Sequence, residues 1–283
     1  MTDSKDSAKV KDLRLKAEEI RRRVIEIIYQ ARAGHTGGSL SSVDVLTALY
    51  FSELRVDPAR PDLPGRDRFI MSKGHSVESL YCVLAKAGFI SDDLLKTYGD
   101  FQSKLGGHPT RKVPGVEMNT GALGHGLPAG VGMAIAAKMD GLPYRTFVMM
   151  GDGEQGEGSI YEAAMSASHH RLDNLVAIID RNGLQISGST EDVMSLEPMR
   201  GRWEAFGWDV HDMDGNDMES ILNTFASIDY ACGRPHLLIS HTTKGKGVSY
   251  MENVAKWHHG VPTDGQYAQA LAEISARIEA LKA

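Results

Sequence analysis

Residues 149–183 read MMGDGEQGEGSIYEAAMSASHHRLDNLVAIIDRNG, and this stretch decides the fold. A short apolar run that ends at Met150 meets a glycine-rich turn, which opens onto a helix-like segment. A second apolar run, LVAIID (175–180), follows the helix. This order of elements is typical of a βαβ unit with two parallel strands. The free backbone N–H groups of such a turn are suited to holding phosphates.

The same alternation of short apolar runs and helical segments continues toward the C-terminus. Two further strands are predicted at WDVHDM (208–213) and PHLLISHT (235–242), with a helix at MESILNTFASIDYA (218–231) between them. Strands joined through helices lie parallel, and a parallel sheet is covered on both faces. The pattern therefore predicts an α/β fold, a parallel β-sheet flanked by helices on both faces.

Upstream of the quoted stretch, glycine-rich loops separate helical segments. Apolar residues at steps of three and four predict a helix from Leu13 to Ala31. The loop GHTGGSLSS (34–42) leads into a helix at VDVLTALYFSEL (43–54), and SKGHSVESLY (72–81) is a turn that opens a third helix. A long loop covers residues 106–130. Compact domains rarely keep such a loop without a functional use.

No repeat or linker divides the chain of 283 residues. We therefore expect a flexible tail at residues 1–12 and a single domain at 13–283. The last part of that domain, from Tyr267 to Leu281, has apolar residues at steps of four and three and is predicted to be an amphipathic helix.

Composition excludes several classes of partner. The formal net charge is −6 and acids and bases are interspersed, which argues against nucleic acid. No apolar stretch approaches the roughly 18 residues that span a bilayer, and the polar N-terminus is not a targeting signal. Cys82 and Cys232 lie far apart in the chain, which fits a reducing compartment, and both are predicted to be buried. We expect a cytoplasmic protein without a membrane partner.

Asp152 lies between two glycines that would have to approach a phosphate. Gly151, Gly153 and Gly156 satisfy the pattern GxGxxG of nicotinamide dinucleotide enzymes. Asp180 ends the next strand, where such an enzyme has the acid that binds a ribose. However, a bare carboxylate beside a diphosphate is repelled by roughly a few kcal/mol unless a cation lies between them. Asp152 therefore argues against a dinucleotide.

A divalent cation would turn this repulsion into ligation, because Mg²⁺ and Ca²⁺ both take carboxylate, amide and carbonyl oxygens. Asn182 follows the neighbouring parallel strand, whose carboxyl end meets the first strand's at one edge of the sheet. The backbone carbonyl of Leu184 would add a third oxygen. These groups predict a metal site that either Mg²⁺ or Ca²⁺ could fill.

Five of the eleven histidines adjoin a glycine: His35, His75, His108, His125 and His259. At this glycine content, chance would place about two there. A histidine in a glycine-rich turn is exposed and held by backbone geometry, which favours a functional site over packing. No zinc spacing such as HExxH occurs.

These residues carry a family resemblance. G151-D152-G153 followed by Asn182 resembles the metal–diphosphate motif of thiamine diphosphate enzymes, although the family often ends in paired asparagines and this chain has D180-R181-N182. GHTGG, SKGHSVESLY, GGHP, NTGALGHG, KGKG and WHHG follow one another in the order found in transketolase. The resemblance to the transketolase family extends from about residue 13 to residue 262.

The resemblance implies a role for each matching residue. Asp152, Asn182 and the Leu184 carbonyl would hold the metal. The diphosphate would be bound by His75 and by the N–H of Gly153, which lies in the turn that starts at Gly151. The cofactor rings would be lined by Gly121, Leu123 and Ile186, and Glu157 would support a subunit contact. Lys244 aligns with a cofactor-side lysine of some relatives, but an exposed loop lysine is an equal alternative. The channel to the reactive carbon would be lined by His35, His108 and either His258 or His259, since both match part of the family's pattern.

The resemblance also implies a transferase that works with a partner. A transketolase moves a two-carbon unit between sugars or sugar phosphates, and a full one has a further domain that binds the aminopyrimidine of thiamine diphosphate. The chain therefore resembles the N-terminal, diphosphate-binding subunit of a split transketolase, whose partner is a C-terminal, pyrimidine-binding subunit in an α2β2 assembly. Deoxyxylulose-phosphate synthases and 2-oxo acid dehydrogenase components share the metal motif. Further alternatives are a nicotinamide oxidoreductase and a binding subunit without catalytic activity.

Overall fold

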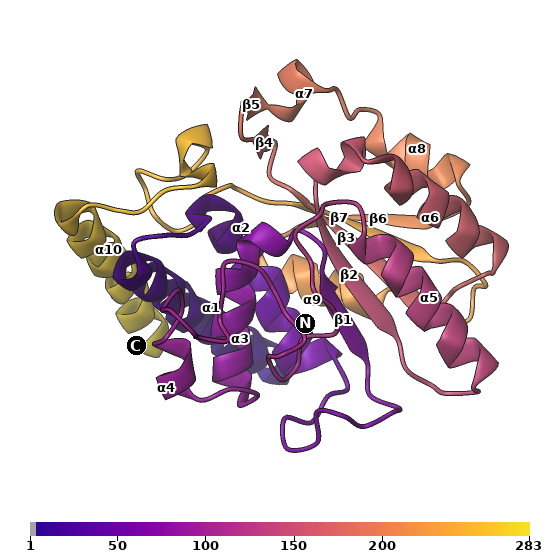
Figure 1. Ribbon diagram of the computed structural model, residues 1–283, viewed down its shortest axis with the longest axis horizontal. Coiled ribbons are helices and arrows are strands. Elements are labelled where there is room, and N and C mark those ends of the chain that lie inside the picture. Colours follow the sequence, from indigo (N-terminus) through magenta and orange to yellow (C-terminus); the bar gives the residue numbers. More distant parts are fainter. Residues whose placement is uncertain (1–3) are drawn as a thin grey trace.

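A computed structural model describes residues 4–283 and shows a five-stranded parallel sheet with helices on both faces (Figure 1). The sheet order is β1-β2-β3-β7-β6, and these strands span Arg68–Met71 (β1), Thr146–Gly151 (β2), Leu175–Arg181 (β3), Asp209–Asp214 (β6) and His236–His241 (β7). Every pairing in this sheet is parallel. The α/β fold predicted from the sequence is confirmed.

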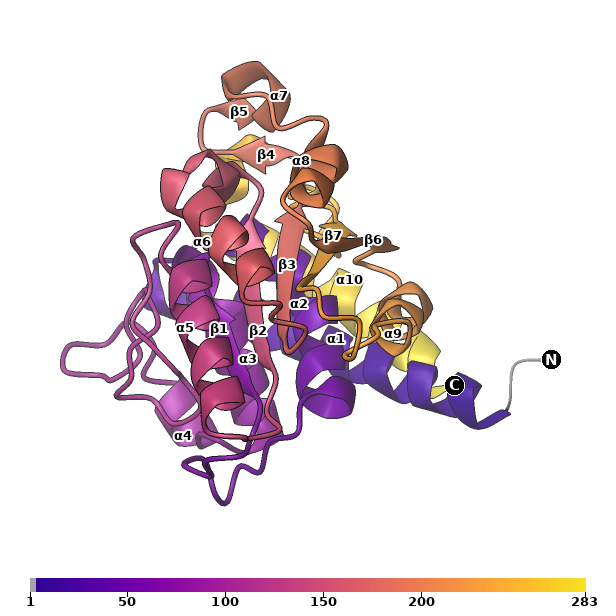
Figure 2. The same ribbon diagram turned by 90° about the vertical axis from the view of Figure 1, so that its right-hand side faces the viewer.

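Helices cover the sheet in two groups, which Figures 1 and 2 show on its opposite sides. The longer helices are α1 (Ser4–Ala31), α2 (Thr36–Ala48), α3 (Val77–Ala87), α5 (Gly126–Met139), α6 (Gly158–His169), α8 (Met199–Ala205), α9 (Met218–Ala226) and α10 (Asp264–Lys282). Shorter elements are η1 (Leu49–Glu53), η2 (Gly74–Ser76), α4 (Asp92–Leu95), η3 (Gly153–Gly156), β4 (Leu184–Gln185), β5 (Gly188–Ser189), α7 (Thr190–Val193) and η4 (Ala255–His258).

Alternate residues of each strand supply two separate cores. In β2, Phe147 and Met149 pack into the core shared with α1, α2, α3 and α9, whereas Val148 and Met150 pack into the core shared with α5, α6 and α8. Successive side chains of a strand point to opposite faces, so an apolar run such as FVMM serves both cores. The helix α10 packs on α1 and therefore belongs to the group of helices that includes α1, α2, α3 and α9.

The N-terminal helix starts earlier than the sequence predicts. The tail expected at residues 1–12 is helical from Ser4 onward, and Val10 is buried in the core. Val10 precedes Leu13 by three residues and so extends the same apolar stripe by one turn. Residues 1–3 of that expected tail lie outside the described part of the chain.

Two predicted loops are partly helical. The loop expected at 34–42 becomes the first turns of α2, which begins at Thr36, and the loop expected at 106–130 ends where α5 begins at Gly126. Tertiary packing outweighs the low helix propensity of glycine at both places. A Cβ on Gly126, for example, would clash with the side chain of Ser72.

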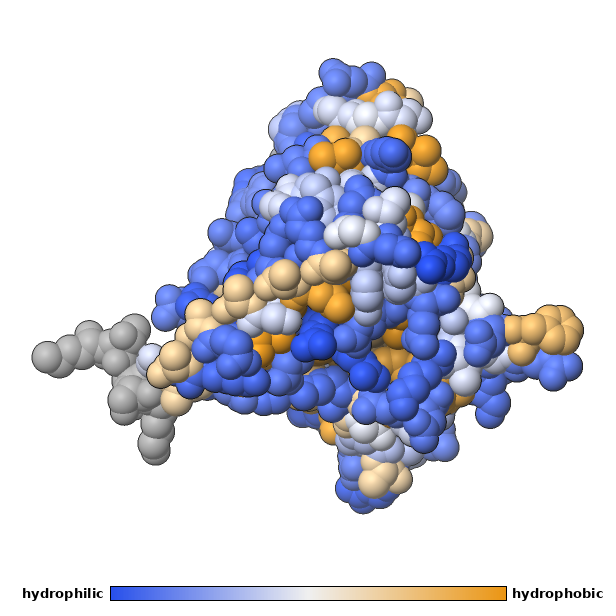
Figure 3. All heavy atoms as spheres, turned by 90° about the vertical axis from the view of Figure 1, so that its left-hand side faces the viewer, coloured by the Kyte–Doolittle hydropathy of each residue, from blue (hydrophilic) through white to orange (hydrophobic). Residues whose placement is uncertain are grey.

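No described helix is both long and apolar enough to cross a membrane. Figure 3 shows the side of the molecule that carries α10, where hydrophobic residues form separate patches among hydrophilic ones.

Candidate functional site

A cavity of about 350 Å³ lies beyond the carboxyl ends of β1, β2 and β3. In a parallel α/β sheet, this edge is where ligands bind. The register pairs Gly151 with Asp180, so the turns that follow β2 and β3 meet there as predicted. The start of α2 and the segment around Lys244 complete the wall.

Most residues predicted for the site line this cavity: His35, His75, Gly121, Leu123, Gly151, Asp152, Gly153, Asn182, Leu184, Ile186, Lys244 and His258. Ile186 is 74% exposed and lies at the rim. Glu157 is exposed and does not line the cavity, so its predicted role at a subunit contact stays a prediction. Lys244 is only 2% exposed, which rules out the alternative of an exposed loop lysine.

Five histidines from four distant segments form one cluster around His35. The ring centroid of His35 lies 5.2 Å from that of His75 and 6.2 Å from that of His108. The rings of His258 and His259 lie 5.7 Å and 4.8 Å from it. The C-terminal pair is held there because Gly260 forms a parallel bridge with His35. Of the four histidines predicted to be catalytic, the other three therefore all adjoin His35.

The structure distinguishes the two C-terminal histidines. His258 lines the cavity, stacks on His75 at a centroid distance of 5.1 Å, and places its Nδ1 3.1 Å from Nζ of Lys244. His259 is exposed and flanks His35 outside the cavity lining. The family's Trp-His pair, at 257–258, is thus the one whose histidine faces the cavity.

Burial holds the inner histidines neutral. It lowers the pKa of His35 to about 4, of His75 to about 2 and of His258 to about 3. Neighbouring positive charge adds to the lowering of the pKa, most strongly from Lys73 at His75 and from Lys244 at His258. A neutral imidazole keeps one N–H donor and one acceptor nitrogen, so each ring can both give and take a hydrogen bond.

The predicted metal ligands lie together on one wall of the cavity. The Asp152 carboxylate is buried and accepts hydrogen bonds from the N–H groups of Gly153 (2.8 Å) and Gly183 (2.7 Å). The Leu184 carbonyl accepts a hydrogen bond from Nζ of Lys244 at 2.9 Å, so a cationic side chain already contacts this oxygen. Asn182 adds a side-chain amide oxygen. Carboxylate, amide and carbonyl oxygens in one place fit a hard divalent ion.

The carboxylate of Asp180 is buried and already hydrogen-bonded within the protein. It is fully buried and accepts hydrogen bonds from Nζ of Lys73 at 2.5 Å and from the hydroxyl of Ser41 at 2.7 Å. Together with the charge of Lys73, these bonds lower the pKa of Asp180 although burial acts to raise it. An acid that is bonded in this way cannot bind a ribose, so Asp180, one of the two features that favoured a nicotinamide cofactor, does not fit that cofactor.

Two buried charged residues of the site were missed by the sequence reasoning. Lys73 neutralises Asp180, and Glu154 accepts hydrogen bonds from the N–H groups of Gly124 and Gly151, both at 2.9 Å. Glu154 thereby joins the long loop to the glycine turn. The available signal was that Lys73 lies within SKGH and that Glu154 directly follows GDG. However, charged residues in loops are usually solvated, so nothing in the sequence indicated that these two are buried.

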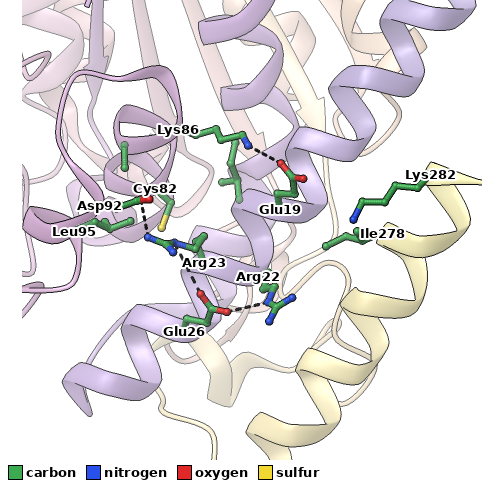
Figure 4. A pocket seen from close by; sticks show the side chains of 12 residues that line it. Glu19, Arg22, Arg23, Glu26, Cys82, Lys86, Asp92, Leu95, Ile278 and Lys282 are labelled. Atoms are coloured by element: carbon green, nitrogen blue, oxygen red, sulfur yellow. Dashed lines mark hydrogen bonds and ion pairs between the residues drawn. The ribbon is translucent and has the colours of Figure 1, made fainter.

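A second cavity of about 390 Å³ lies between α1, α3, α4 and α10 (Figure 4). Its charged side chains are largely paired with one another, as in Lys86–Glu19 at 2.7 Å and Arg23–Asp92 at 2.7 Å. These ion pairs account for its polar lining, and none of the predicted site residues lines it.

Comparisons with known proteins agree with this geometry. Residues 13–274 match the family described as transketolase, thiamine diphosphate binding domain. The chain is 65% identical to a protein of Phocaeicola vulgatus that is named as a subunit of apulose-4-phosphate transketolase, and 49% identical to the protein with the same name from Actinobacillus succinogenes. These matches cover 96% and 93% of this chain, and 97% and 96% of the two relatives.

Among solved structures, transketolase from Campylobacter jejuni superposes with a TM-score of 0.84 at 29% identity. The superposition covers 95% of this chain but only 48% of that one, so the chain spans about half the length of that transketolase. By contrast, the chain covers 97% and 96% of the two relatives that are named as subunits. The chain therefore belongs to the transketolase family and contains its thiamine diphosphate-binding domain.

Proposed function

We propose that this chain, with a separate pyrimidine-binding subunit, transfers a two-carbon glycolaldehyde unit from a ketose to an aldose. The observation that carries this proposal is that the metal-type oxygen donors and the histidine cluster adjoin one another at a single cavity. The oxygen donors suit a metal-bound diphosphate, and the imidazoles suit the hydroxyls of a sugar.

Each part of the cavity has a distinct task in this proposal. Asp152, Asn182 and the Leu184 carbonyl hold Mg²⁺ or Ca²⁺, and the Gly153 N–H and the neutral His75 donate to the diphosphate. When bound, thiamine diphosphate supplies the electron sink for cleaving the ketose next to its carbonyl.

The remaining histidines handle the sugar. His35, His108 and His258 hydrogen-bond its hydroxyls and move protons during the transfer, which the neutral rings of His35 and His258 permit in both directions. A donor ring nitrogen and an acceptor ring nitrogen are both present on each neutral imidazole. This suits a reversible reaction, in which each group must give a proton in one direction and take it back in the other.

The partner is expected to be the pyrimidine-binding half of a transketolase, in an α2β2 assembly. The names of two relatives support this, because both are matched over nearly their whole length and both are named as subunits. Closed two-fold symmetry is the commonest way to double such a pair.

The relatives' names suggest a substrate class. Two of them are named for apulose 4-phosphate, so we propose a ketose phosphate as donor and that sugar as the first to be tested. We also propose that the protein is cytoplasmic, as its sequence predicts.

The decisive experiment mixes the purified chain with the pyrimidine-binding subunit, thiamine diphosphate and Mg²⁺, and measures the transfer from apulose 4-phosphate to an aldose phosphate. Transfer is expected only when both chains are present. Equal activity of this chain alone would contradict the split-enzyme proposal.

Calorimetric titration of the pair with thiamine diphosphate plus Mg²⁺, compared with NAD, separates the two cofactor classes.

A variant tests whether the chain is catalytic. His108→Ala is expected to lower kcat by about 100-fold or more, because a positioned proton-transfer group contributes on that order. His170→Ala, an exposed histidine at the end of α6, is the matched control and should keep full activity. Full activity of His108→Ala in an intact assembly would remove this residue from the mechanism.

A further inference from the structure

Four possible metal ligands gather at the amino ends of β6 and β7, at the opposite end of these strands from the cofactor edge. Asp209 is the first residue of β6, and its register partner is His236, the first residue of β7. His211 lies two residues after Asp209, on the same face of β6. Cys232 lies in the tight turn that precedes β7 and, against the sequence expectation, is only half-buried.

The donor atoms of these side chains are close to one another. Oδ2 of Asp209 lies 2.9 Å from Nε2 of His211 and 3.2 Å from Nδ1 of His236. The Sγ of Cys232 lies 4.0 Å from Nε2 of His236. One ligand atom each of Asp209, Cys232 and His236 can be chosen so that all three lie within 4.8 Å of one another.

The surroundings favour ligand binding by His236. Its side chain is fully buried, with Nδ1 toward Asp209 and Nε2 toward Cys232, and an imidazole nitrogen is a common ligand for metals of the zinc type. A guanidinium nitrogen of Arg234 lies 2.9 Å from Oδ1 of Asp209, which leaves Oδ2 for the imidazoles. Asp173 accepts a hydrogen bond from the N–H of Gly233 and holds the turn beside the cluster.

We propose that Asp209, Cys232 and His236 bind a divalent transition metal ion of the zinc type, with His211 as the fourth ligand. Tetrahedral bonds of about 2.0–2.3 Å place ligand atoms about 3.3–3.8 Å apart. At Oδ2 of Asp209 the separations of 2.9 Å and 3.2 Å from the two imidazoles lie just below that range, and one ligand atom each of Asp209, Cys232 and His236 lies within 4.8 Å of the others. Rotations of the half-buried Cys232 and Asp209 side chains would complete the site.

The ligand chemistry separates this site from the cofactor metal site. A thiolate and two imidazoles favour Zn²⁺ or Co²⁺ over Mg²⁺ and Ca²⁺, which prefer oxygen ligands. On binding, Cys232 loses its thiol proton to solvent and its sulfur bonds the metal. The bound ion links the edge strand β6 to the turn before β7, so the inference concerns stability and is independent of the proposed transfer reaction.

The test uses the full chain, treated with a chelator and then kept in excess Mg²⁺ so that oxygen-rich sites are filled. Titration with Co²⁺ is expected to produce a thiolate-to-cobalt charge-transfer band at one ion per chain, and Zn²⁺ should abolish that band. Zn²⁺ should also slow the alkylation of Cys232 by iodoacetamide at least about tenfold, as measured by mass spectrometry of the peptide.

Variants locate the site. Cys232→Ser, at a half-buried position that tolerates the change, should remove the band while circular dichroism stays unchanged, and Asp209→Asn should weaken Co²⁺ binding by about 10–100-fold. Two matched controls should keep the band: Cys82→Ala, the other free thiol, and His241→Gln, the histidine at the far end of β7 that pairs with Asp212. Absence of the band, or its survival in Cys232→Ser, overturns the proposal. Equal rates of Cys232 alkylation with and without Zn²⁺ would mean that this thiol does not bind the metal, and this result also overturns the proposal.

Discussion

Asp152 shows how a single residue can exclude one cofactor and favour another. The glycines around it would serve a dinucleotide or a metal-bound diphosphate equally well, but a buried carboxylate needs a positive partner. Burial raises the pKa of Asp152 and the nearby Asp180 adds to this effect, while the N–H groups of Gly183 and Gly153 and the charge of Arg181 lower it. A divalent ion would supply far more positive charge than these partial compensations.

At the residue scale, Asp152→Asn tests the metal ligand. The amide keeps the size but loses the charge, and its NH₂ group faces a backbone N–H where an oxygen now accepts. We expect metal-dependent binding of thiamine diphosphate to the two-subunit enzyme to weaken by at least about tenfold in calorimetric titrations. Asp192→Asn, an exposed acid on α7, is the matched control and should bind like the wild type. Unchanged affinity in Asp152→Asn would remove this residue from the site.

The start of α2 shows how an element can depend on a neighbour far away in sequence. His35, Gly37 and Gly38 are placed beside segments near residues 75 and 257, and a helix begins there because the glycines allow that close approach. A Cβ on Gly37 would lie 2.8 Å from the backbone oxygen of Trp257, and one on Gly38 would lie 2.6 Å from Oγ of Ser76. The close approach of the start of α2 to these two segments brings the histidines together.

At the element scale, Gly37→Ala should destabilise the chain by about 1–3 kcal/mol, because the added methyl group meets a backbone atom that has little freedom to move. Gly132→Ala, on the exposed side of α5 with nothing within 4 Å of the added Cβ, is the matched control. It should stabilise the chain by about 0.5–1 kcal/mol through helix propensity. Urea unfolding measures both changes, and an equal effect of the two variants would contradict the packing argument.

The whole molecule determines the protonation of the histidine cluster. The five rings come from segments as far apart in the chain as residues 35 and 259, and the fold partly buries three of them beside Lys73 and Lys244. An unfolded chain would leave each imidazole near its ordinary pKa of about 6.5. The folded and unfolded states therefore bind different numbers of protons over a wide range of pH.

At the scale of the molecule, this difference predicts how stability depends on pH. The pKa of His75 falls to about 2 on folding, so below about pH 6.5 the unfolded state takes up a proton that the folded state refuses. The stability that the neutral ring contributes is therefore present above that pH and lost as pH falls. Replacing His75 with Asn should reduce the acid-side slope of the unfolding free energy by up to about 1.4 kcal/mol per pH unit.

Urea unfolding at a series of pH values between about 7 and 4 measures this slope. His125→Asn changes an exposed histidine outside the cavity lining and should leave the slope as in the wild type. Parallel curves for the wild type and His75→Asn would contradict the burial-induced shift.

The local pattern determined the parallel sheet, the glycine turn after β2, and the meeting of Asp152 with Asn182. These depend on short-range periodicity and on the rule that neighbouring parallel strands end at one edge, which is readable from one chain. The family resemblance added the histidines. Only the tertiary structure placed His258 inside the cavity and His259 outside it, buried Lys73, Lys244 and Glu154, and began a helix in the loop at Thr36. Each of these depends on contacts between segments distant in sequence, whose desolvation and steric fit no local pattern records.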